Sequence, residues 1–138
     1  MNIVDALMQA DANKTKEYTT KKIKSNKLAR IIGADEPVEI TIREIKPRRF
    51  NDLSTRHIKS NGDVDYSKFF DTKLIIVTEG VEEPNLKDKK LQEHFGVERA
   101  VDLAEILFGS EINTIADAIT EISGYTDDVE AEVEDVKN

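Results

Sequence analysis

The chain has 138 residues, 38% hydrophobic and 35% charged, with a formal net charge of −8 and no cysteine. This length and composition fit one domain with a core of modest size, and the absence of cysteine excludes disulfides, thiolate chemistry and cysteine-based zinc sites. No apolar run approaches the roughly 18 residues of a membrane span, and the acidic N-terminal segment lacks the basic start of a secretory signal, so a cytoplasmic protein fits best.

The N-terminal segment NIVDALMQAD predicts a helix of about two turns. Its periodicity places Ile3, Val4, Leu7 and Met8 on one stripe, and Asn2 is a plausible cap. An isolated helix of that length is marginal in water. We therefore expect it to dock on the body of the protein or on a partner.

The next segments predict a linker, a small β element and a second short helix. Residues 11–17 resemble a linker, and EYTTKKIK favours a strand weakly. SNKLARIIG predicts a short helix that ends at Gly33 and turns Leu28, Ile31 and Ile32 inward. VEITIRE alternates cleanly, which is typical of a half-buried strand. Together these segments predict a hairpin-sized antiparallel sheet near residues 18–43.

The middle of the chain is helical in pattern. Pro47 suits the first position of a helix, and SNGDVD marks a turn after it. Asp65 can cap the following helix, whose apolar residues leave little polar face, so we expect it to be the central buried helix. The apolar residues predicted to face inward in these two helices are Phe50, Leu53, Ile58, Tyr66, Phe69, Phe70, Leu74 and Val77.

Three shorter helices are predicted next. Asp88 caps one that ends at Gly96, a second ends at Gly109, and a third begins after the cap Ser110 and ends at Gly124. The last two have the most regular apolar stripes of the chain. Their members are Val97, Ala100, Val101, Ala104, Leu107 and Phe108 in one, and Ile112, Ile115, Ala116, Ile119 and Ile122 in the other.

The predicted fold class is mainly α (α+β): a compact helical domain over residues 1–125 with the small β element. Residues 126–138 contain six acids, one lysine and three isolated valines. Such a segment cannot bury enough surface to offset its ordering entropy, so we expect a disordered acidic tail.

The sequence offers little sign of catalysis or metal binding. No two glycines form a phosphate-binding loop, and no serine lies in a nucleophile motif. Asp63, Asp65 and Ser67 have the spacing of a calcium loop, but Lys68 stands where that loop needs glycine. Neither His57 nor His94 has a second histidine or a cysteine at helical spacing. We therefore expect no enzyme activity, no cofactor and no metal.

The charge is divided unevenly along the chain. Residues 14–59 carry +7 and residues 60–138 carry −13. This asymmetry fits either a basic face for nucleic acid or two solvated faces that attract each other. The residues that could line a phosphate-binding face are Arg48, Arg49, Arg56 and Lys59.

The stretch GVEEPNLKDKKLQEHFG, residues 80–96, resembles the XkdN-like phage tail assembly chaperones. The resemblance continues in order through the first helix, the strand VEITIREI and the last helix, GSEINTIADAITEISGY, and covers residues 2–125. The residues of this sequence that carry the family pattern are Glu83, Pro84, Leu86, Phe95, Gly96, Glu111, Ile112, Asn113, Ile119, Ser123, Gly124 and Tyr125.

The resemblance implies a non-enzymatic role in assembling the tail of a long-tailed phage or a prophage-derived element in the cytoplasm of a bacterial host. Such chaperones coat the tape measure protein, keep it soluble and help recruit tail tube protein, and they are absent from the finished particle. Members are often made in two forms by ribosomal frameshifting, so a frameshifted longer form of the chain is a further implied partner.

Tape measure proteins expose long apolar helical stripes, so a chaperone for one needs an apolar docking surface. The first helix and the last two stripes are the candidates, although all three stripes could instead be core, which is the interpretation that we favour for the last two. The candidate partner-binding residues are Ile3, Val4, Leu7, Met8, Val101, Leu107, Ile112 and Ile119.

Two other functions remain open on the sequence. Residues 14–59 could make the chain a small nucleic-acid-binding regulator of a mobile element, which predicts salt-dependent binding. The acidic second half could instead mimic nucleic acid, which predicts a basic protein partner.

Overall fold

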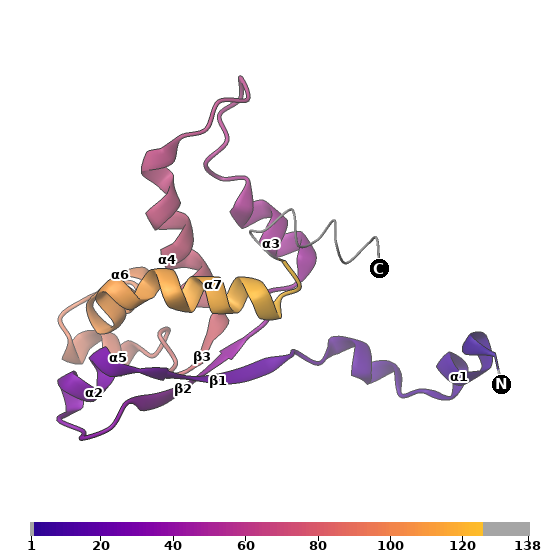
Figure 1. The fold of residues 1–138 in the computed structure, drawn as a ribbon, viewed down its shortest axis with the longest axis horizontal. Coiled ribbons are helices and arrows are strands. Elements are labelled where there is room, and N and C mark those ends of the chain that lie inside the picture. The colour runs from indigo at the N-terminus through magenta and orange to yellow at the C-terminus, as the bar shows by residue number, and fades with distance from the viewer. Residues whose placement is uncertain (1, 126–138) are drawn as a thin grey trace.

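The computed structural model describes residues 2–125 of the chain, so the tail predicted for residues 126–138 lies outside the described residues. The described part forms seven α-helices, three short 3-10 helices and one three-stranded sheet (Figure 1). The predicted mainly α fold with a small antiparallel β element is therefore confirmed. No helix among residues 2–125 is long and apolar enough to cross a membrane.

The sheet is antiparallel, with strand order β1-β2-β3. Strands β1 (Thr20–Ser25) and β2 (Val38–Arg43) pair as a hairpin whose connection contains helix α2 (Asn26–Ile32). In β2, Ile40 and Ile42 are buried, as the alternation predicts. The third strand, β3 (Val81–Glu83), pairs with β2 and was not predicted, because three residues are too few to show alternation.

Helix α4 (Phe69–Gly80) is the centre of the helical layer and leads directly into β3. It packs against α3 (Pro47–Ser54), α6 (Ala100–Phe108) and α7 (Ile112–Ile122), and α7 also contacts β2 (Figure 1). Helix α5 (Lys89–His94) is short and is capped by Asp88, as predicted. The core lies between these helices and the inner face of the sheet, and its large fully buried side chains are Ile40, Ile42, Leu53, Val77, Leu86, Leu103, Phe108, Ile112 and Ile119.

Several residues predicted to face inward are exposed. In α2, Leu28 is buried but Ile31 and Ile32 are not, because this seven-residue helix meets the body through one turn only. The loop between α3 and α4 and the start of α4 extend beyond the other helices (Figure 1). Ile58 in the loop and Phe70 in the first turn of α4 are therefore exposed. Tyr66 and Phe69 are exposed in the same region, so α4 is exposed over residues 69–71 and contributes buried residues from Thr72 onward.

The boundary between the last two helices also differs from the prediction. Gly109 begins a 3-10 turn, η3 (Gly109–Glu111), that leads into α7 without a gap, and no side chain caps α7. Ser110 is therefore not the cap that its position suggested. The predicted glycine ends are confirmed at Gly33 and Gly124, whose φ angles of 74° and 93° lie in the left-handed region that glycine tolerates.

Candidate partner-binding surfaces

Helix α1 (Ile3–Gln9) carries the most exposed apolar stripe of the described residues. Ile3, Val4, Leu7 and Met8 are 78%, 67%, 68% and 81% exposed, and α1 has no buried residue. Asn2 caps the helix as predicted, since its Oδ1 accepts a hydrogen bond from the backbone N–H of Asp5 at 2.8 Å. The helix is formed, yet the body of the protein leaves its apolar side uncovered.

Residues 2–19, which we call the N-terminal arm, extend away from the body (Figure 1). The base of the arm is held by polar contacts. The Thr19 N–H donates to the Glu44 carboxylate at 3.0 Å, and the Lys46 ammonium donates to the Glu17 carbonyl at 3.0 Å. The Tyr18 ring lies 4.6 Å from the Arg43 guanidinium. The backbone N–H of Thr19, with Lys46 beside it, holds the pKa of Glu44 below its usual range.

Between the base and α1, the linker is more regular than predicted. It contains the 3-10 helix η1 (Ala12–Lys16). The Asp11 carboxylate caps the start of η1 by accepting from the Asn13 N–H at 2.9 Å, and the Thr15 hydroxyl donates to the Ala12 carbonyl at 2.8 Å. The arm therefore has local structure along most of its length.

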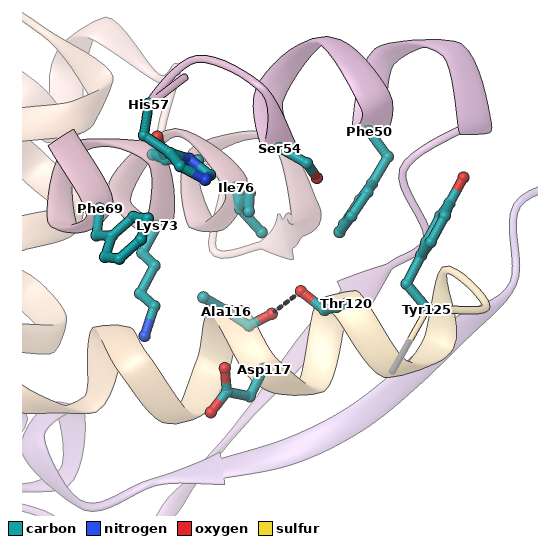
Figure 2. Close-up of a pocket in the computed structure, with 11 residues that line it drawn as sticks. Phe50, Ser54, His57, Phe69, Lys73, Ile76, Ala116, Asp117, Thr120 and Tyr125 are labelled. Carbon is teal, nitrogen blue, oxygen red and sulfur yellow. Dashed lines mark hydrogen bonds between the residues drawn. The ribbon is translucent and has the colours of Figure 1, made fainter. Parts of the chain in front are cut away.

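A second surface is a groove between helices α3, α4 and α7, with a volume of about 510 Å³ (Figure 2). Phe50, Ser54 and His57 line it from one side at helical spacing. The Tyr125 ring stacks on the Phe50 ring at 4.3 Å between centroids and closes one end. The remaining lining residues are Phe69, Thr72, Lys73, Ile76, Ala116, Asp117 and Thr120.

Two polar side chains of this groove have hydrogen-bond partners within the protein. The Thr120 hydroxyl donates to the Ala116 carbonyl at 2.8 Å (Figure 2), and Lys73 donates to the Asn113 side chain at 3.0 Å. His57 packs edge-on against Phe69 at 4.5 Å, and its buried Nδ1 has no hydrogen-bond partner. The arrangement suits an apolar guest that brings a few polar atoms rather than a reaction.

Beyond the groove, apolar side chains gather at the loop between α3 and α4 and at the start of α4. This hairpin tip is closed by a β-bridge between Ile58 and Val64. Asp65 caps the 3-10 turn η2 (Tyr66–Lys68) by accepting from the Ser67 N–H at 3.1 Å, which confirms its predicted capping role. The exposed apolar side chains of the tip are Ile58, Val64, Tyr66, Phe69 and Phe70.

The other predicted binding residues lie elsewhere. Leu107, Ile112 and Ile119 are between 0% and 3% exposed. They belong to the core because α6 and α7 pack against α4. For these three residues the structure therefore agrees with the core interpretation of the stripes and not with an exposed binding surface. Val101 is half-buried and lines a shallow pocket with Arg99 and Asp102.

The residues that carry the family pattern hold the fold together. The Glu111 carboxylate accepts hydrogen bonds from the Ser25 hydroxyl and from the first backbone N–H groups of α2. The Leu86 carbonyl accepts from the buried Gln92 side chain at 2.8 Å, and a cis peptide bond precedes Pro84. The stretch 80–96 is therefore a structural segment that supplies β3, a turn and α5.

Several basic side chains of residues 14–59 are paired with acids. Arg49 binds the Glu79 carboxylate through two nitrogens, with a shortest distance of 2.6 Å, and this hydrogen bonding raises the pKa of Arg49. Lys22 lies 3.4 Å from Glu39 on the neighbouring strand. These pairs fit the interpretation of solvated faces that balance each other.

The groove and the hairpin tip were missed in the sequence. The spacing of Phe50 and Ser54 does place them on one face of α3, but the sequence contains no sign that α7 and Tyr125 complete a cavity with that face. The periodicity predicts inward-facing positions for the tip residues other than Val64, because it does not reveal where a helix extends beyond its neighbours.

Three comparisons with known proteins were made. The family model described as phage XkdN-like tail assembly chaperone protein matches residues 4–137. No curated protein matches the chain. The crystal structure of the protein YqbN, a target of the Northeast Structural Genomics Consortium, aligns with a TM-score of 0.55 at 17% identity, over 84% of this chain and 97% of that one. At that identity the likeness shows a shared fold.

Proposed function

We propose, for a chain that belongs to the family of phage XkdN-like tail assembly chaperones, that it binds the tape measure protein and keeps it soluble before the tail tube encloses it. In this proposal the chain also helps recruit tail tube protein, works in the cytoplasm of the bacterial host, and is absent from the finished particle. The role is one of assembly, without catalysis.

The observation that supports this proposal is the stripe of α1. Four large apolar side chains on two turns, each at least 67% exposed, form a docking helix that the body of the protein does not cover. A tape measure protein is a long helical chain with apolar stripes of its own. Two such stripes can pack side by side and exclude water from both.

The magnitude is adequate for specific but reversible binding. Full burial of one such side chain contributes roughly 1.5–3 kcal/mol, so four of them, already partly covered, would supply about 4–8 kcal/mol. The loss of translational and rotational freedom on association offsets much of that gain. Reversible binding is what an assembly factor needs if it is to leave the particle.

The charge of the chain favours the same role. A formal net charge of −8 repels copies of the complex from one another and so opposes aggregation while apolar segments are covered. Within the described residues, Arg49, one of the four side chains that could line a phosphate-binding face, is engaged by Glu79. The exposed stripe of α1 favours tape measure binding over nucleic-acid binding.

The test is co-expression with the large helical protein that the proposal names as partner. The variant Val4→Asp/Leu7→Asp places two carboxylates in the stripe, so we expect the tape measure protein to become insoluble and to stop co-purifying. The matched control is Ala6→Asp/Gln9→Asp, which adds the same charge with the same spacing on the opposite side of α1.

The control should bind as the unmodified chain does, and circular dichroism should show the same folded domain for both variants, because α1 contributes no buried residue. If the stripe variant still co-purifies with the tape measure protein, α1 is not the docking element. If the unmodified chain neither keeps the tape measure protein soluble nor co-purifies with it, the proposed function itself is wrong.

A further inference from the structure

We infer that the groove between α3, α4 and α7 is a receptor for helix α1 of a second copy of this chain. Two copies would exchange their N-terminal arms and form a closed symmetric dimer. The apolar stripe of α1 and the groove would then cover each other. This inference rests on the geometry of the arm and the groove and does not depend on binding to the tape measure protein.

The base of the arm lies close to one end of the groove. The backbone N–H of Glu44 donates to the Thr19 carbonyl at 2.8 Å, so residue 19 is fixed beside the end of β2. The next residue, Ile45, donates from its N–H to the Ser123 hydroxyl at 2.9 Å. Ser123 is two residues from Tyr125, whose ring closes that end of the groove. The base of the arm therefore lies beside the end of the groove that the Tyr125 ring closes.

The arm does not turn back into its own groove. Its base is held by the contacts of Glu17, Tyr18 and Thr19, which fix the direction in which the chain leaves the sheet. The capped turn η1 adds length to the arm in that direction. The result is an arm that carries α1 away from the body (Figure 1). A formed arm that points away from its own body is suited to reach the groove of a neighbour.

Groove and helix are complementary in chemistry. A volume of about 510 Å³ lies in the range of cavities that enclose a compact apolar guest. The rings of Phe50, Phe69 and Tyr125 supply apolar walls (Figure 2). The buried Nδ1 of His57 has no hydrogen-bond partner, and α1 carries Asp5 beside its stripe. A carboxylate is a suitable acceptor for an imidazole N–H.

Because each copy both gives its arm and receives the arm of the other, we expect a closed dimer and not an open chain of copies. Each copy has one arm and one groove, so two copies related by a twofold axis satisfy both arms and both grooves at once. The same segment, α1, would then be withheld from other apolar partners until the dimer opens. A helical partner with a longer apolar stripe would compete with the second copy for α1.

Cysteine crosslinking tests the inference directly, because the chain has no cysteine of its own. Tagged full-length Leu7→Cys is mixed with untagged full-length Ser54→Cys, and in a separate mixture with Thr120→Cys, and each mixture is oxidised. We expect a disulfide that joins the two different chains. The matched control is Asp52→Cys, on the face of α3 opposite Phe50 and Ser54, which should give only background crosslinking.

Light scattering on a size-exclusion column gives the second measurement. The unmodified chain should elute with twice the monomer mass of 15.6 kDa. Leu7→Asp and Ser54→Trp should each restore the monomer, the first by spoiling the stripe and the second by filling the groove, whereas Asp52→Trp should remain a dimer.

Three results would overturn the inference. One is a monomer at every concentration together with no crosslink between chains. Another is a double variant, Leu7→Cys/Ser54→Cys, that crosslinks within a single chain, which would place α1 in its own groove. The third is a dimer that Leu7→Asp and Ser54→Trp leave intact, since the interface would then lie elsewhere. None of these results bears on whether the tape measure protein binds.

Discussion

Glu111 is expected to stabilise the fold by holding the start of helix α2 from a distant part of the chain. Its Oε1 accepts from the Ser25 hydroxyl at 2.5 Å, and its Oε2 accepts from the Asn26 backbone N–H at 2.9 Å. Ser25 in turn caps α2 by accepting from the Leu28 N–H at 3.1 Å. The substitution Glu111→Ala removes a carboxylate from a helix N-terminus and leaves the buried Ser25 hydroxyl without its acceptor.

The loss of stability expected for Glu111→Ala depends on which of these hydrogen bonds water can replace. Asn26 is exposed, so its N–H can bond to solvent when the carboxylate is gone. Ser25 is only 1% exposed, so its bond is lost outright. A hydrogen bond to a charged group is worth about 1.5–3 kcal/mol, and a carboxylate at a helix N-terminus adds about 0.3–1 kcal/mol. We expect Glu111→Ala to lower the free energy of unfolding by about 2–3 kcal/mol.

The assay is urea unfolding followed by circular dichroism, with the change in Tm as a second measure. A loss of that size corresponds to a Tm lower by roughly 10 °C in a domain of this length. The control is Glu105→Ala, an exposed position on α6 that carries the same change in charge. A loss for Glu111→Ala below about 0.5 kcal/mol, the range of ordinary surface substitutions, or no larger than that of the control, would refute the reasoning.

Two further predictions concern packing and pH. Gly80→Ala would place a methyl carbon 2.5 Å from Ile119 Cδ1, so we expect urea unfolding to show a loss of about 1–3 kcal/mol, partly relieved when Ile119→Val is added. If Ile119→Val does not reduce the loss caused by Gly80→Ala, the predicted contact between residues 80 and 119 is wrong. Because the pKa of Glu44 is lowered in the folded state, by the Thr19 N–H first, its stabilisation is present above its usual pKa and is lost as pH falls through the folded value. The unfolding free energies of Glu44→Gln and the unmodified chain should therefore differ at pH 7 and converge in acid, and a constant difference would count against it.

Much of the secondary structure follows from rules that act within a few residues. Asn2 and Asp88 cap their helices, Gly33 ends one, and the alternation of VEITIRE forms β2, all as the sequence predicts. These features can be predicted from the sequence because each depends on one side chain or on a short hydrophobic repeat. Strand β3 was not legible, since its three residues become a strand only when β2 lies beside them.

The candidate sites could be predicted only in part. The stripe of α1 is visible in the sequence, and so is the expectation that it docks on the body or on a partner. The groove is not visible, because Ser54 and Tyr125 are brought to one cavity by the packing of α3, α4 and α7. The role of Glu111 was hidden for the same reason, since its hydrogen-bond partner Ser25 lies 86 residues away in the chain.

Leu7 and Leu107 show where local pattern ends and packing begins. Both lie on regular apolar stripes, and periodicity treats them alike as residues that need cover. Leu107 is 3% exposed because α6 packs against α4, whereas Leu7 is 68% exposed because the base of the arm directs α1 away from the body. The amino-acid pattern establishes that a helix has an apolar side. Which element covers that side depends on contacts between distant segments, and for α1 no described element of the chain does so.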